Sequence, residues 1–125
     1  MKPELRRLPD SELEVMQAVW RCESPATRKD IEKQLDREPP MAATTLLTLL
    51  TRLTEKGFLR TEKEGRGSVY WPLVERHDYL SSQSESFIRK LCGGSMSAFA
   101  SALCDSGLSK NELEELRRLL KENLL

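Results

Sequence analysis

The chain has 125 residues, which fits one small domain with a short appendage and leaves little room for two independent cores. Its 20 Lys and Arg residues balance 20 Asp and Glu residues, so the overall charge gives no sign of a nucleic-acid partner. No apolar run approaches the ~20 residues of a membrane span, and Met1–Asp10 lacks the apolar core of a signal peptide. We therefore expect a cytoplasmic protein without membrane insertion.

Two amphipathic helices are predicted before the proline pair at residues 39 and 40. The first begins around Pro9 and ends before Pro25, because a residue that precedes proline disfavours helix. It places apolar side chains about one turn apart, at Leu13, Met16, Val19 and Trp20. Thr27 is a suitable N-cap for the second helix, Arg28–Asp36.

A third helix is predicted over Ala42–Lys56, with Gly57 as its C-terminal cap. Its leucines form one stripe, at Leu46, Leu49, Leu50 and Leu53. Two β-prone runs follow, Phe58–Lys63 and Ser68–Leu73, joined by a glycine-containing turn. Three short helices followed by a hairpin predict a mainly α, winged helix-turn-helix domain over residues 1–75, with a two-stranded wing.

The chain from residue 76 onward is predicted to be helical throughout. We expect helices at Asp78–Leu91, Met96–Cys104 and Ser109–Leu124, the last opening with a capping box. The apolar side chains of this region could form a domain core or a dimer seam, and we favour dimerisation because no other large apolar surface remains to cover them. The expected dimerisation residues are Phe87, Leu91, Phe99, Leu103, Leu113, Leu116 and Leu120.

The third helix carries a polar face opposite its leucine stripe. Thr44, Thr48 and Arg52 follow each other at intervals of four residues, with Thr45 beside them, and their methyl, hydroxyl and guanidinium groups suit base edges in DNA. An ordinary solvated face would show the same spacing. Threonine is a poor helix former, however, so four threonines between residues 44 and 51 favour a functional reason.

Basic side chains flank this face in the predicted fold. Arg66 lies at the hairpin turn with Lys63 nearby, where it could reach a phosphate or a minor groove, although spacing alone favours a solvated turn arginine. Arg28 belongs to a basic side of the second helix that acidic residues dilute, so it is expected to position the DNA backbone at most.

Nothing in the sequence indicates catalysis, a cofactor or a metal site. His77 is the only histidine, so no His-based triad can be assembled. The three cysteines, Cys22, Cys92 and Cys104, lack the spacing of a metal site. We therefore do not expect an enzyme.

Several segments together resemble the BlaI/MecI family of penicillinase repressors, and the resemblance covers nearly the whole chain. They are Leu13-Glu14-Val15-Met16 with Val19-Trp20, Thr44-Thr45, Leu50-Thr51-Arg52-Leu53-x-x-Lys56-Gly57, Glu64-Gly65-Arg66 with Tyr70, and Asp78 through Ser86-Phe87. No single motif is diagnostic, but their order and spacing are specific.

The resemblance implies a homodimeric repressor of antibiotic-resistance genes that binds a palindromic operator in double-stranded DNA. In such proteins a membrane-bound sensor metallopeptidase triggers proteolysis of the repressor. The third helix would read the major groove through Thr45, Thr48 and Arg52, and Arg66 would be the wing arginine. Thr44 stands where relatives often have lysine.

Two further features of the family bear on this chain. The cleavage position falls at Ser101 and Ala102, where relatives that respond to β-lactams carry an Asn-Phe pair. The copper-responsive branch carries C-terminal Cys-x-Cys pairs, and this chain lacks them.

Two alternative functions remain open from the residues alone. Zero net charge and the acid-diluted second helix would suit a winged-helix protein-interaction module without DNA binding. Cys92 and Cys104 could instead serve thiol or metal sensing near a dimer axis, although isolated thiols are more often plain apolar side chains.

Overall fold

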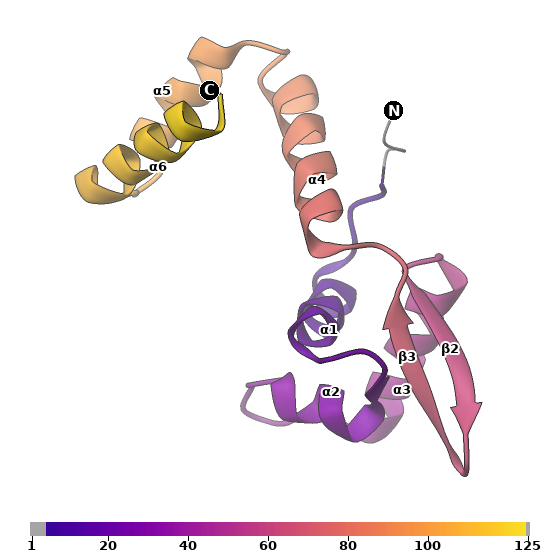
Figure 1. Cartoon of the computed structure of the whole chain (residues 1–125). Helices are drawn as coiled ribbons and strands as arrows, with labels where there is room; N and C mark the ends of the chain where they lie inside the picture. The colour runs from indigo at the N-terminus through magenta and orange to yellow at the C-terminus, as the bar shows by residue number, and fades with distance from the viewer. Residues whose placement is uncertain (1–4, 125) are drawn as a thin grey trace. The chain divides into compact units, whose positions relative to one another are not determined.

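The computed structural model describes residues 5–124, and within them helices and a small sheet alternate along the chain (Figure 1). In chain order the elements are α1 (Asp10–Arg21), β1 (Ala26–Thr27), α2 (Arg28–Gln34), α3 (Ala43–Glu55), β2 (Leu59–Glu64), β3 (Gly67–Pro72), α4 (Arg76–Leu91), α5 (Met96–Cys104) and α6 (Lys110–Asn123). The contacts divide the chain into two compact units between Gln83 and Ser84.

Helices α1 and α2 begin at residues that favour a helix N-terminus. Thr27 caps α2 as predicted: its hydroxyl accepts from the Asp30 amide at 3.1 Å, and the Asp30 carboxylate accepts from the Thr27 amide at 3.0 Å. Helix α2 ends at Gln34, two residues earlier than expected, with the next residue already extended. Helix α1 starts directly after Pro9 and carries acidic residues in its first turn, where the helix dipole favours them.

Helix α3 is held by its leucine stripe and ends at a glycine. Leu46, Leu49, Leu50 and Leu53 are all buried, which confirms the predicted stripe. At the C-terminus Gly57 adopts a φ of 83°, a left-handed conformation that only glycine adopts without strain. Its amide donates to the Thr54 carbonyl at 3.1 Å, and the Phe58 amide donates to the Leu53 carbonyl at 2.9 Å, the pattern of a Schellman cap.

The sheet has three antiparallel strands in the order β1-β3-β2, one more than the sequence analysis predicted. Strand β1 pairs Ala26 with Tyr70 and Thr27 with Val69, and two residues are too few to show a strand pattern in a sequence. In the hairpin, the pairing of β2 with β3 runs from Leu59 opposite Pro72 to Glu64 opposite Gly67. Its two-residue turn extends past the helices in Figure 1.

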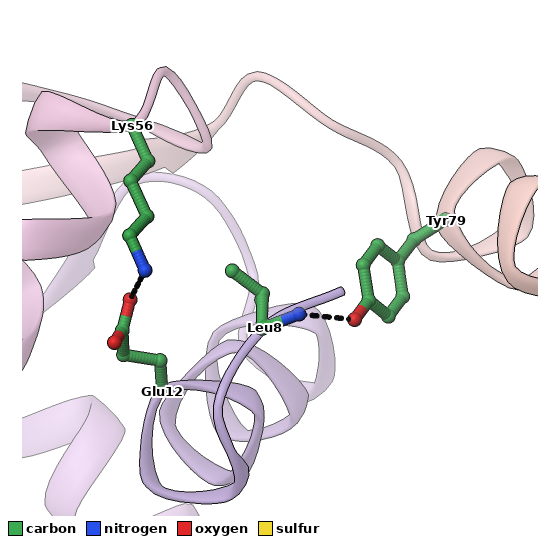
Figure 2. Close-up of polar contacts among 4 residues, drawn as sticks. All are labelled: Leu8, Glu12, Lys56 and Tyr79. Atoms are coloured by element: carbon green, nitrogen blue, oxygen red, sulfur yellow. Dashed lines mark hydrogen bonds and ion pairs between the residues drawn. The ribbon is translucent and has the colours of Figure 1, made fainter. Parts of the chain in front are cut away.

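The core of this unit lies where α1, α2 and α3 meet the sheet. The buried apolar residues of the described chain all fall between residues 8 and 79. One buried charge accompanies them: the Glu12 carboxylate, 4% exposed, pairs with the Lys56 ammonium at 2.5 Å and so joins the start of α1 to the end of α3 (Figure 2).

The first two turns of α4 pack with the N-terminal unit. Tyr79 is buried, its ring lies 5.8 Å from those of Trp20 and Phe58, and its hydroxyl accepts from the Leu8 amide at 2.8 Å (Figure 2). The side chains of the following turn bond the main chain of Leu5. The compact N-terminal unit therefore reaches beyond residue 75, while the division of function at residues 75 and 76 stays a prediction.

The C-terminal unit consists of the rest of α4 with α5 and α6, and none of its described residues is buried. Phe87 and Phe99 form an edge-to-face pair at 5.9 Å. Helix α6 opens with the predicted capping box, in which Ser109 and Glu112 exchange hydrogen bonds of 3.1 and 2.8 Å. Across residues 5–124, we find no helix with the length and apolar character that a bilayer crossing requires.

Candidate nucleic-acid interface

The exposed face of α3 carries the predicted polar residues. Thr44, Thr45, Thr48 and Arg52 are all exposed, on the side away from the buried leucine stripe. With Leu49 they line a shallow hollow of about 300 Å³. The residues predicted on this helix therefore share one exposed face.

The threonine hydroxyls of α3 donate back to its own backbone. Thr48 donates to the Thr44 carbonyl at 2.9 Å, and Thr51 donates to the Leu47 carbonyl at 2.9 Å. A hydroxyl has one donor and two acceptor lone pairs, so each threonine can still accept from a base amino group. The helix thus presents methyl groups and hydrogen-bond acceptors, both of which match features of base edges in the major groove.

A second and larger hollow of about 620 Å³ joins three elements that are far apart in the sequence. Arg28 and Lys29 come from α2, Leu47 from α3, and Arg66 from the hairpin turn. Three cations and one carboxylate, that of Glu64, line this hollow, so its local charge is positive although the chain is neutral. Such a surface suits a phosphate backbone.

The three cations of the larger hollow differ in whether they form an ion pair with an acidic side chain. Arg28 lies 3.6 Å from Glu32 one turn along α2, an exposed pair that water screens. Within residues 5–124, neither Lys29 nor Arg66 makes an ion pair. Lys63 is exposed on β2, opposite Ser68, and lines neither hollow, so the fold separates it from the other predicted residues.

Tyr70 also lines the larger hollow. Burial raises the pKa of its phenol above the usual value of 10.0, so the hydroxyl stays protonated at neutral pH and can donate to an anion. In the sequence, Tyr70 was only a mark of resemblance, Leu47 was not identified and Lys29 had no role of its own. Only the fold shows which side chains share the hollow with Arg66.

The predicted dimerisation and cleavage residues lie in the C-terminal unit. Among the expected dimerisation residues, Phe87, Leu91 and Leu120 are exposed and the others are half-buried. Ser101 and Ala102 are exposed on α5. The three cysteines are free thiols, and the described residues hold no group of three His, Cys, Asp or Glu side chains that could bind a metal ion.

Helices α1, α2 and α3, strand β1 and the β2–β3 hairpin that follows α3 define a winged helix-turn-helix protein, which confirms the predicted fold class. A solved structure agrees: the DNA-binding domain of the repressor BlaI, in solution, matches with a TM-score of 0.51 and 37% identity, over 63% of this chain and 94% of that domain.

Comparison with protein families gives the more specific result. Residues 8–122 match the family model described as penicillinase repressor. The penicillinase repressor of Bacillus licheniformis is 35% identical over 118 residues, 94% of this chain and 91% of the relative. The methicillin resistance regulatory protein MecI of Staphylococcus aureus (strain N315) is 33% identical over 113 residues, 90% of this chain and 91% of that protein. The chain belongs to the penicillinase repressor family, as its motifs predicted.

Proposed function

We propose that this chain is a transcriptional repressor of antibiotic-resistance genes that inserts α3 into the major groove of a palindromic operator. The observation that carries the proposal is the division of α3 into two sides. Its leucine side is used in the core, whereas Thr44, Thr48 and Arg52 stay open to solvent beside a hollow lined by cations. The names of the relatives, which are repressors and regulators and not enzymes, support it.

The two hollows that α3 helps to line suggest separate roles. Thr44, Thr45 and Thr48 would contact base edges, and Arg52 at the same hollow would bond a guanine or a phosphate. Arg28, Lys29 and Arg66 would hold the backbone across the larger hollow. Lys63, farther along the hairpin, would add only long-range attraction.

Binding to DNA can be tested without knowing the operator. The purified full-length chain is mixed with a pool of random duplexes, and retained sequences are amplified over several rounds. We expect a palindromic sequence to be enriched. If no sequence is enriched and the protein also fails to retain fragmented DNA at low salt, the proposal is wrong and a protein-interaction module takes its place.

The roles of the side chains are then tested on the enriched duplex by fluorescence anisotropy. Arg66→Ala is expected to weaken binding evenly across sequences and to reduce the salt slope by about 0.9, the contribution of one phosphate contact. Thr48→Ala is expected to relax the preference at one base position of each half-site. Arg117→Ala on α6 removes the same charge from an exposed position outside both hollows and serves as the control.

The homodimer is proposed to form through the C-terminal unit. The described residues 84–124 include no buried side chain, and Leu91 and Leu120 are 74% and 55% exposed. About 40 residues cannot enclose a stable core alone, so a second copy would have to cover these side chains. The resulting twofold axis would give an operator with two related half-sites.

Release from the operator is proposed to follow cleavage at Ser101 and Ala102, signalled by a membrane sensor metallopeptidase. Both residues are exposed on α5, so a protease could reach them after local unwinding of the helix. Treatment of producing cells with a β-lactam, followed by mass spectrometry of the repressor, would test this. A fragment ending at Ser101 is expected, and an intact chain during full induction would contradict the proposal.

A further inference from the structure

Leu47 is the one leucine of α3 that the core does not use. Its side chain is 43% exposed, whereas Leu46, Leu49, Leu50 and Leu53 are at most 3% exposed. It lies on the same side of the helix as Thr44 and Thr51, its neighbours one turn away. An apolar side chain therefore stands within the polar face that is proposed to enter the major groove.

The surroundings of Leu47 indicate what kind of group it could contact. It lines the larger hollow together with Arg28, Lys29 and Arg66, which come from two other elements. A docking protein would have to bury these cations along with the leucine, at a cost in desolvation. A nucleic-acid strand instead brings phosphates to the cations, so the charge around Leu47 favours DNA as the occupant.

The major groove offers one apolar group that a leucine can recognise. Thymine carries a C5-methyl group on its major-groove edge, and the other three bases carry none there. A leucine at the side of the recognition helix, next to cations that hold the backbone, meets the outer part of that edge. A hydrogen-bonding side chain at this position would select other features.

We propose that Leu47 is a specificity-determining residue that selects a thymine in each half-site through van der Waals contact with the thymine methyl group. This inference rests on the proposed function, because it requires α3 in the major groove. It assigns to Leu47 an apolar contact with the bases in addition to those that the threonine methyl groups can make.

The decisive experiment removes the methyl group from the DNA and the side chain from the protein in turn. Each thymine of the enriched duplex is replaced singly by deoxyuridine, and the affinities of the parent and of Leu47→Ala are measured by fluorescence anisotropy. At one thymine of each half-site, we expect deoxyuridine to weaken the parent about fourfold, the equivalent of one buried methyl group at ~0.8 kcal/mol. Leu47→Ala is expected to bind deoxyuridine and thymine equally at that position.

Leu80→Ala is the matched control, because Leu80 is 45% exposed on another helix and lines neither hollow. This variant is expected to keep the full discrimination between thymine and deoxyuridine. Circular dichroism of Leu47→Ala should match the parent, since the buried stripe of α3 is untouched.

The outcomes separate this inference from the function on which it rests. If the random pool yields no enriched duplex, the role of Leu47 is overturned, and if the protein also fails to retain fragmented DNA at low salt, the proposed function is wrong as well. If a duplex is enriched but no deoxyuridine substitution weakens the parent, or if Leu47→Ala still discriminates as the parent does, DNA binding stands and the role of Leu47 is overturned.

Discussion

The hydrogen bond between Tyr79 and Leu8 gives a sharp test of how α4 is attached to the N-terminal unit. Tyr79→Phe keeps the aromatic ring and removes only the hydroxyl that accepts from the Leu8 amide at 2.8 Å. Both residues are nearly inaccessible, 4% and 1% exposed, so water cannot readily replace the lost acceptor. A buried donor left without a partner costs about 1–3 kcal/mol.

We expect Tyr79→Phe to lower the free energy of unfolding by that amount, measured by urea denaturation followed by circular dichroism. In a unit of this size the melting temperature should fall by roughly 5–15 °C. The ring contacts with Trp20 and Phe58 remain, so the fold itself should persist.

The other tyrosine supplies the control. Tyr70 is also buried, at 6% exposed, but the hydrogen-bond partner of its hydroxyl is the half-buried Ser68 hydroxyl beside the larger hollow, which can turn to water. Tyr70→Phe should therefore cost less than about 1 kcal/mol. If the two variants lose equal stability, the buried hydrogen bond does not hold the start of α4 in place and the reasoning is wrong.

Three further predictions concern the core ion pair, the C-terminal unit and pH. Lys56→Met leaves the buried Glu12 carboxylate unpaired and should lower the free energy of unfolding, measured by urea denaturation, by about 1–3 kcal/mol. This loss is smaller than for a fully buried pair, because Lys56 is partly exposed. The control Lys63→Met, at an exposed position, should change the free energy of unfolding very little. Leu116→Asp should halve the mass seen by light scattering, and an unchanged mass would argue against dimerisation through α6. Hydrogen bonds from Thr27 lower the pKa of Asp30 below its usual value of 3.8. This cap therefore stabilises the fold above that pH, and its contribution is lost as the pH falls through the lowered pKa. In Asp30→Asn, the free energy of unfolding followed in an acid titration should lack this loss.

Local patterns in the sequence were sufficient for the helices and the hairpin. The leucine stripe of α3, the caps at Thr27 and Ser109, and the glycine at residue 57 all act on residues within one or two turns. Hydrophobic periodicity and capping chemistry depend on such short separations, so a single sequence reveals them. The exposed threonine face followed directly, as the side of α3 opposite its leucines.

Only the tertiary structure decided what lies next to that face. Strand β1 exists because Ala26 and Thr27 find partners in β3 more than 40 residues later, and Tyr79 is buried because α4 folds back on residue 8. Likewise, the larger hollow brings Arg28, Leu47 and Arg66 together from three separate elements. Such contacts form between distant segments, and no periodic pattern within either segment encodes its partner.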